Sequence, residues 1–498
     1  MQSYKERFAD EIEKIEGQNR ILLMTLPSIV EVGEELELRM VMTDNSGMPH
    51  EDFTGKVSLV PSSAGIEAPE SVEFERADRA MKTVPGVRIT EPGVHFLEGH
   101  VEGSPSKPQV SNPVKAVENA TERLFWGDIH VHSVLGTCHA DYSKSPEFGY
   151  WFAKQVSNLD FSAVTDHLRG ITPEKWEHLK RLAREETRDG EFVVFLAFES
   201  SHSKDHGGDI NVYYRDDEAG YFWLEREDMK GTTPKVGLDV LWDWLDDQGV
   251  PYISIPHHTG RAGKYRNFEL PYYKKENESL LEIFSMWGSS EGRHDDFYLK
   301  GGKAEERAYL RDALELGYKY GVIGSSDTHF TMPGTPCSQL PRPYTHPQNK
   351  MVNQGLAAVY APELTREALF DSMMNRNCFA TTSMRPILRL WVNGTSMGQT
   401  ARVNTDKPGA RKVRVELCTS ALSPEVELLC NNQVIHRARA REPHTIVDFE
   451  DDRDAGPLWI TGSPKNRNPF FYYYVKVNFH GVYDGITAWS SPIWVEQG

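Results

Sequence analysis

The sequence predicts an α/β protein in which a β/α barrel of parallel strands is flanked by an N-terminal and a C-terminal β-sandwich. Two patterns support this prediction. Between about residues 120 and 383, apolar strand-like runs alternate with helical stretches, as they do in parallel β/α folds. On either side, short strands of alternating apolar and polar residues are separated by Gly and Pro, which is typical of sandwiches. Three domains are therefore expected, over residues 1–118, 119–383 and 384–498.

Local patterns predict the elements of each domain in turn. The first domain is expected to begin with a short polar helix over residues 1–20, followed by the alternating strands of ILLMTLPSIVEVGEELELRMVMTD. The stretch SPSKPQVSNPVKAVENA, with three prolines, predicts the linker out of it. In the central region Ser145 and Thr172 each precede Pro-Glu, so they are predicted N-caps of two helices. After residue 384 the strand pattern returns, for example in FFYYYVKVNFHG.

Composition limits the partners and the compartment. The 55 Lys and Arg against 73 Asp and Glu give the 498-residue chain a net charge of −18. Nucleic acids and anionic membranes require a basic surface, so the expected partner is a small-molecule substrate, of which an anion is one option. The charged N-terminus does not read as a signal peptide, and no apolar run approaches the roughly 20 residues of a membrane span. Five cysteines without C-x-x-C spacing are expected to be free thiols in a reducing cytoplasm.

Five apolar runs end in residues that can bind metal ions or move protons. They read LFWGDIHVH, DFSAVTDH, FVVFLAFE, PYISIPHH and YGVIGSSDTH, and they begin at residues 124, 160, 192, 251 and 320. Side chains alternate along a strand, so Asp128, His130 and His132 share one face. Because the carboxyl ends of parallel strands carry the chemistry of β/α folds, the five sets of side chains are expected to converge.

The residue types at these strand ends indicate a hydrolytic metal site. Imidazole and carboxylate ligands without paired thiolates suit Zn, Mn or Fe, rather than a structural zinc held by cysteines. A single catalytic ion needs only three protein ligands, and the runs offer more, so two or three divalent ions are expected. Glu199, at the end of an apolar strand, is placed to bridge two of them.

The order of these motifs resembles a known superfamily. HVH, TDH, the strand-end Glu199, PHH and SDTH are similar to the motifs of the PHP (polymerase and histidinol phosphatase) superfamily. GDIHVHS, AVTDH, GGDINVYY, GSSDTHFTMPGTP and AWSSPIWVE resemble its DUF3604 branch more closely. The main resemblance covers about residues 120–383. It implies a PHP domain with a distorted (β/α)7, TIM-like barrel, a di- or trinuclear metal site, and phosphoesterase or other metal-dependent hydrolase activity.

The resemblance also implies a ligand set. Its members are His130, His132, His139, His167, Glu199, His257, His258, Asp327 and His329. His130 and His132 would hold one ion with Asp327, Glu199 would bridge to a second, and His167 and His329 would hold a third. Which of His257 and His258 serves is left open, because neighbours on a strand face opposite ways.

Two loops depart from the branch pattern. In the loop after His132, either His139 or Asp141 is available as a ligand. In GGDINVYY, Ile210 stands where a histidine is common in the branch, so His206 or Asp209 would have to replace it, or one ion would be missing.

Five residues are predicted to act on the substrate: Glu199, Asp166, His294, Arg261 and Arg293. Arg261 and Arg293 follow strand ends, and a guanidinium group matches phosphate or carboxylate with two hydrogen bonds. They are hypothesised to form an anion clamp. The alternative is that they pair only with their acidic neighbours, and His294 is either a catalytic acid or a plain loop residue.

The resulting hypothesis is a metal-dependent hydrolase in which metal-bound hydroxide attacks a phosphoester. No G-x-S-x-G serine elbow offers a competing nucleophile. The first alternative is cleavage of a carboxylic ester, carbamate or lactone at the same metals. The second is a metal-binding module without activity, framed by the two sandwiches.

Overall fold

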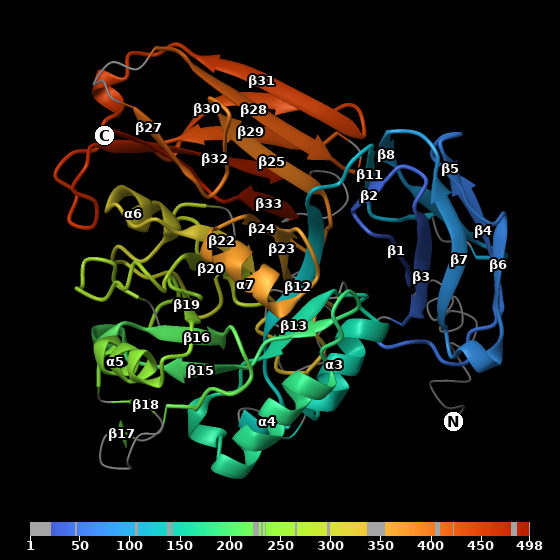
Figure 1. Ribbon diagram of the computed structural model, residues 1–498, viewed down its shortest axis with the longest axis horizontal. Coiled ribbons are helices and arrows are strands. Elements are labelled where there is room, and N and C mark those ends of the chain that lie inside the picture. The colour runs from blue at the N-terminus through green and yellow to red at the C-terminus, as the bar shows by residue number, and fades with distance from the viewer. Residues whose placement is uncertain are drawn as a thin grey trace, which may run out of the picture. The chain divides into compact units, whose positions relative to one another are not determined.

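The computed structural model describes most of the chain and places it in two compact units (Figure 1). It describes residues 21–44, 47–104, 108–136, 141, 143–222, 229–230, 233–234, 236–263, 266–295, 299–335, 354–403, 409–421, 423–479 and 486–497. The first unit comprises Met1–Thr121 with Thr335–Met351 and Cys418–Ser420, and the second comprises the rest. The helix predicted over residues 1–20 lies outside the described residues.

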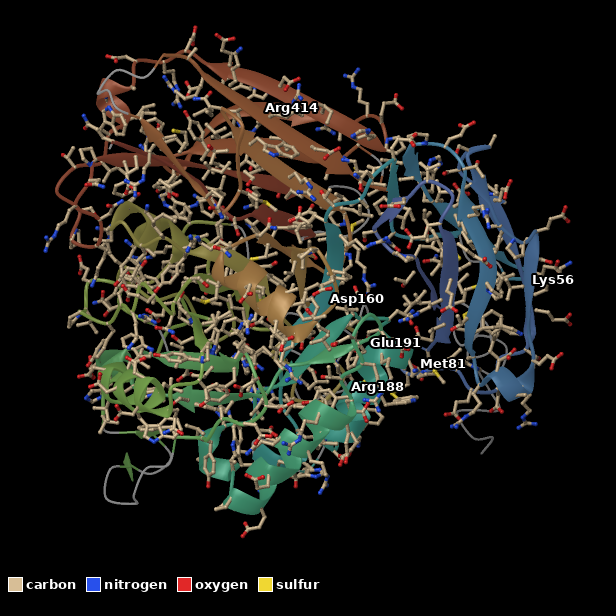
Figure 2. The ribbon with its side chains drawn as sticks, in the orientation of Figure 1. Lys56, Met81, Asp160, Arg188, Glu191 and Arg414 are labelled. Carbon is tan, nitrogen blue, oxygen red and sulfur yellow. The ribbon has the colours of Figure 1, made fainter. Side chains whose placement is uncertain are left out.

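The first unit is built from sheets around one core, and their strands pair antiparallel except for β2 and β11, which pair in parallel. One sheet has the order β1 (Ile21–Thr25), β3 (Glu35–Thr43), β7 (Met81–Ile89), β5 (Ile66–Glu67). Another has the order β10 (Gln109–Val110), β9 (Leu97–Val101), β4 (Gly55–Pro61), β6 (Ser71–Phe74), and a third joins β2 (Ile29–Glu31), β11 (Val114–Val117) and β8 (Gly93–His95). Leu38, Val57 and Leu97 belong to the same buried cluster, while Lys56 on β4 points to solvent (Figure 2). The alternation of apolar and polar residues in the sequence thus separates a face that packs in the core from a face exposed to solvent.

A long mixed sheet organises the second unit. Its main path is β14 (Val193–Val194), β13 (Phe161–Val164), β12 (Arg123–Val131), β23 (Gly355–Ala361), β24 (Cys378–Thr382), β33 (Thr487–Ser490), β32 (Phe470–Asn478), β29 (Glu425–Cys430), β30 (Gln433–Arg439). β34 (Ile493–Gln497) adds to β32 and also pairs with β27 (Thr400–Val403). Because β33 pairs with β24, strand pairing continues from the middle of the chain into its C-terminal part.

Smaller sheets complete the second unit. They have the orders β15 (Ala197–Ser201), β16 (Asp209–Tyr214), β19 (Tyr252–Pro256); β21 (Gly288–Ser289), β20 (Leu280–Ser285), β22 (Gly321–Gly324); and β26 (Thr395–Ser396), β25 (Ile387–Val392), β28 (Arg411–Cys418), β31 (His444–Asp451). β17 (Met229–Lys230) pairs with β18 (Thr233–Pro234). Arg414 on β28 is exposed and faces outward, where it pairs with Asp448 (Figure 2).

The described part of the chain contains few helices, and the two helix starts predicted at Ser145 and Thr172 are confirmed. The α-helices of the described residues are α3 (Pro146–Gln155), α4 (Pro173–Glu185), α5 (Leu238–Gln248), α6 (Leu310–Glu315) and α7 (Arg366–Met374). The side chains of Ser145 and Thr172 accept hydrogen bonds from the backbone N–H groups of Phe148 and Lys175, so each caps its helix. Within the described residues, no helix combines the length and the apolar character needed to cross a membrane.

The predicted α/β class with a distorted (β/α)7 barrel and two flanking sandwiches is wrong; the described chain is a β-rich fold of many sheets. β16 runs antiparallel to both β15 and β19, and β23 runs antiparallel to both β12 and β24. Only residues 202–208 join β15 to β16, whereas a parallel neighbour needs a crossover of about a dozen residues or more. This short connection forces an antiparallel turn where a barrel would require a helix.

Candidate metal centre

The end of β12 and the segment after β22 meet side by side, and this brings the first three candidate ligands together. Val131 bridges Thr328 in parallel, and the backbone N–H of His132 donates to the Thr328 carbonyl at 2.9 Å. As a result Asp327 Oδ1 lies 3.4 Å from His130 Nε2 and 3.2 Å from His132 Nε2. All three side chains are buried. The H-x-H spacing places both imidazoles on the face that Asp327 approaches.

Glu199 lies at the middle of the cluster. It is buried on β15, and its backbone bridges His167 in parallel just beyond β13. Its Oε2 lies 3.1 Å from His167 Nδ1 and 3.3 Å from His132 Nε2, while Oε1 lies 3.3 Å from His257 Nε2. One carboxylate therefore faces imidazoles from three separate strand ends, which is the position a bridging ligand would occupy.

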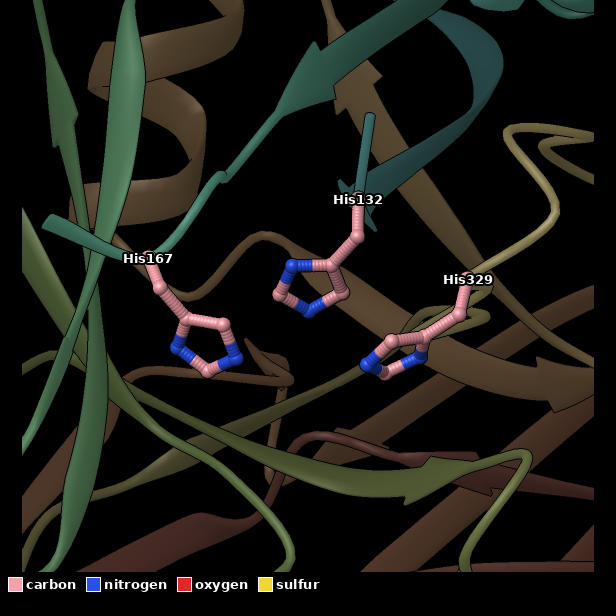
Figure 3. A group of neighbouring side chains, drawn as sticks. All are labelled: His132, His167 and His329. Carbon is pink, nitrogen blue, oxygen red and sulfur yellow. The ribbon is translucent and has the colours of Figure 1, made fainter. Parts of the chain in front are cut away.

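Three histidines gather on one side of the centre, as Figure 3 shows. The His132 ring lies between His167 and His329, with ring centroids 4.8 and 4.3 Å away. Each of the three residues offers a ring nitrogen within 4.8 Å of the other two. They lie in the segments that follow β12, β13 and β22, so only the folded chain brings them together.

Asp209, His257 and His258 form a further group. Asp209 begins β16 and its Oδ2 lies 3.6 Å from His258 Nε2. Both histidines that follow β19 therefore belong to a potential ligand group. His257 also belongs to a second group, with His130 and Glu199. His206 joins none of the groups found among the described residues; its Nδ1 lies 2.7 Å from Ser203 Oγ.

These groups suit more than one ion. The centre contains four overlapping triads, namely His132/His167/His329, His130/Glu199/His257, His130/His132/Asp327 and Asp209/His257/His258. The first and the last share no residue, and neither do the first and the second. Two ions can thus each have three ligands of their own. Imidazole and carboxylate are ligands that Zn, Mn and Fe accept.

The hydrogen bonding of the centre points the same way. His130 Nε2, Glu199 Oε2 and His257 Nε2 are buried and make no hydrogen bond to any described residue. Leaving such atoms unsatisfied costs free energy, and most buried polar atoms in proteins have a partner. A cation among these atoms would satisfy them, so the donor set could hold a metal ion.

The surroundings of the candidate ligands shift several of their pKa values. Burial opposes ionisation of Glu199, but the imidazoles around it, His167 foremost, hold its pKa well below the usual range. Burial lowers the pKa of His167 to about 3 and pushes the pKa of His258 well below its usual value. The lowered pKa values favour an ionised Glu199 and neutral imidazoles at His167 and His258, which is the protonation state that metal ligands need.

The sequence interpretation missed Glu282, which supports the centre from β20. This buried carboxylate lies with Oε2 2.9 Å from His130 Nδ1. A carboxylate on the second ring nitrogen fixes the tautomer and the orientation of a metal-binding histidine. The sequence signal was an acid inside the apolar run LLEIFS, where an unpaired charge would be costly.

Two further buried carboxylates hold the loops that carry the ligands. Asp128 accepts hydrogen bonds from the backbone N–H groups of Ser326 at 2.9 Å and Gly334 at 2.8 Å. Asp166, predicted to be catalytic, accepts from the backbone N–H and hydroxyl of Ser133 in the loop after His132. Burial raises the pKa of each carboxyl to about 6. Neither belongs to a ligand triad.

Two of the candidate ligands are among the described non-glycine residues with a positive φ. His258 and Asp327 have φ of 33° and 54°, in the left-handed region that residues other than glycine rarely adopt. Such conformations persist where the surrounding structure enforces them, and they are frequent at functional sites.

The remaining predicted residues lie in different places. His139 lies outside the described residues, and Asp141 is exposed. His294 is exposed, and Arg293 pairs with Glu305 on the surface. Arg261 is different, because its guanidinium carbon lies 3.9 Å from the ring centroid of Trp287, which neighbours the ligands.

Comparison with known proteins adds a family match. Residues 310–410 match the model of DUF3604, a family described as proteins of unknown function. An uncharacterized protein of Chlamydia pneumoniae is 23% identical over 422 residues, and one of Chlamydia trachomatis is 22% identical over 425 residues. Each match covers 83% of this chain and 64% of the relative, so the chain spans less than two thirds of their length.

Solved structures give only weak likenesses. The CARDB domain of the PF1109 protein from Pyrococcus furiosus is matched over 22% of this chain and 93% of that chain, with 10% identity and a TM-score of 0.14. A Paenibacillus cycloisomaltooligosaccharide glucanotransferase is matched over 94% of this chain and 71% of that chain, with 7% identity and a TM-score of 0.24. TM-scores this low carry no argument about fold or function.

Proposed function

We propose that the chain is a metal-dependent hydrolase that cleaves phosphoesters at a centre of two or three divalent transition-metal ions. The observation that carries the proposal is the convergence of six histidines and three carboxylates, nearly all buried, from separate strand ends. A purely structural metal site would need four ligands and would be closed. Here the ligands outnumber what one ion needs, as expected of a hydrolytic centre with more than one ion.

The ligand motifs also support a relationship to the PHP superfamily. The supporting feature is the order of HVH, TDH, Glu199, PHH and SDTH, whose residues fall into the triads. This proposal rests on the motifs and on the ligands they supply, and it requires no barrel.

The residues of the chain have separable roles in the proposed reaction. Bound ions would supply a water acidified towards neutral pH and would polarise the phosphoryl oxygen. Glu199 would bridge neighbouring ions, since its two oxygens face different histidines. Glu282 would keep His130 oriented with Nε2 towards Asp327. Asp128 and Asp166 would fix the loops behind the ligands.

A panel of chromogenic esters tests the proposal. Metal-replete protein should hydrolyse a phosphate ester faster than a carboxylic ester, and the double variant His130→Ala/His132→Ala should lose the activity. His178→Ala is the matched control, because His178 is on α4, where it pairs with Glu147. Faster cleavage of carboxylic esters, carbamates or lactones would favour the alternative class of hydrolase. No cleavage of any of them by protein that retains its ions would favour a binding module.

A further inference from the structure

Two cations lie close to one aromatic ring beside the candidate metal centre. Trp287 is buried, and its ring centroid lies 6.0 Å from that of His329 and 6.5 Å from that of His258. The guanidinium carbon of Arg261 lies 3.9 Å from the Trp287 centroid, and the ammonium nitrogen of Lys300 lies 4.2 Å from it. We name Arg261, Trp287 and Lys300 the cationic wall.

Backbone hydrogen bonds and a glycine turn position the residues of the cationic wall. Lys300 N–H donates to the Trp287 carbonyl at 2.7 Å, and Arg261 Nε donates to the Lys300 carbonyl at 3.1 Å. Gly301 has a φ of 89°, and a Cβ there would lie 3.3 Å from Arg261 Nε, so glycine both permits the turn and leaves room for the guanidinium group. These hydrogen bonds fix the backbone of Lys300 beside Trp287 and the guanidinium group of Arg261 against that backbone.

The two positive charges of the cationic wall repel each other. Burial, and after it the nearby Arg261, lowers the pKa of Lys300 to about 8. The π face of a tryptophan attracts each cation, but it does not remove the repulsion between them. An anion placed beside both cations would relieve that repulsion. The arrangement stands out in a chain whose net charge is −18 and which repels anions at long range.

We infer that the cationic wall binds the anionic group of the substrate, and that this substrate is a phosphate monoester. The inference rests on the proposed function, and it adds the substrate class. Arg261 and Lys300 are both half-buried, so they can meet a ligand at the edge of the centre. Two positive groups suit the two negative charges of a monoester better than the single charge of a diester.

Calorimetric titration of the metal-loaded chain with inorganic phosphate tests the cationic wall without turnover. Arg261→Gln and Lys300→Gln should each raise the Kd for phosphate by about tenfold to a hundredfold, as expected for loss of a hydrogen bond to a charged group. Lys300→Arg should restore most of the binding. Arg307→Gln is the matched control, because Arg307 forms surface pairs with Asp312 and Glu315.

The outcomes separate this inference from the proposed function. Phosphate binding that depends on Arg261 and Lys300, without hydrolysis of any ester, would support the wall and contradict the hydrolase. No phosphate binding by the wild type, or equal binding by all variants, would overturn the wall. Loss of bound metal in Arg261→Gln and Lys300→Gln would also overturn it, because the two cations would then support the metal centre and not the substrate. With an active enzyme, KM for a monoester should rise in both variants while KM for a neutral ester stays unchanged.

Discussion

Glu282 Oε2 lies 2.9 Å from Nδ1 of His130, and the opposite nitrogen of the same ring lies 3.4 Å from Asp327 Oδ1. The imidazole is thus held between one carboxylate behind it and the candidate ligands in front. Asp327 and Glu282 raise the pKa of His130 well above its usual value, although burial opposes this. Replacement of a proton by a metal ion on Nε2 would use the same orientation.

Glu282→Gln should therefore weaken the centre without removing a ligand. The amide keeps the size of the side chain but loses the charge that orients His130. Metal affinity or turnover is expected to fall by about tenfold to a hundredfold, the usual effect of losing such a partner. Metal-binding titrations against a fluorescent chelator would measure it. Glu305→Gln, in a surface pair with Arg293, is the control; equal affinities of Glu282→Gln and the wild type would refute the orienting role.

Glu199→Gln tests the bridge. One of its oxygens lies near His167 and the other near His257, so the neutral amide should disturb both neighbouring groups at once. We expect turnover to fall by about a hundredfold or more and the ions to be lost together rather than one at a time. Stepwise titration with a chelator distinguishes these patterns. Turnover near that of the wild type would rule out bridging.

Removal of the metal should destabilise the folded chain. Without a cation, several buried polar atoms of His130, Glu199 and His257 lack partners. A ligand that binds only the folded state stabilises it by about 2.7 kcal/mol at a concentration about 100 times its Kd. Chelation should lower Tm in differential scanning fluorimetry, and added Zn²⁺ or Mn²⁺ should restore it. A Tm insensitive to both treatments would count against bound ions.

Glu291 predicts a pH dependence of stability away from the metal centre. This buried carboxylate accepts hydrogen bonds from Arg311 at 2.8 Å, Lys476 at 2.7 Å and Trp489 at 3.0 Å. Burial raises its pKa, but Lys476 and Arg311 outweigh that effect and bring the pKa to about 2. Because the pKa is lower in the folded state, the stabilisation is complete above the ordinary value near 4.5 and is lost as pH falls towards 2.

The matched measurement compares the free energy of unfolding of wild type and Glu291→Gln by urea at several pH values. Breaking a buried ion pair costs about 3–5 kcal/mol, so the variant should be less stable by this amount at neutral pH. The difference should shrink between pH 4.5 and 2 as the wild-type carboxylate is protonated. A difference that stays constant over this range would show that the charge of Glu291 does not stabilise the fold.

The clustering of the candidate side chains was easier to predict from sequence than the fold. His130 and His132 share a face because strand periodicity is local, and the caps of α3 and α4 follow from Ser145 and Thr172 alone. Strand direction is not local. The apolar run of β16 looks the same whether it pairs in parallel or antiparallel, and the short connection after β15 was the available clue against a barrel.

The missed residues share a physical cause. Glu282 is 152 residues from His130 in sequence, and Lys300 reaches Trp287 through a turn, so no periodicity links either pair. Their functional meaning depends on contacts that only the folded chain makes. Arg261 and Arg293 looked equivalent in sequence, but Arg261 packs against Trp287 while Arg293 pairs with Glu305.

The central claim is that the converging histidines and carboxylates hold metal ions, and the metal content of the purified chain tests it most directly. Elemental analysis by mass spectrometry of protein from a metal-replete preparation should find at least two transition-metal ions per chain, as the two independent ligand groups require. The His130→Ala/His132→Ala variant should contain at least one ion fewer. Wild-type protein that is properly folded and free of metal after such a preparation would contradict the account.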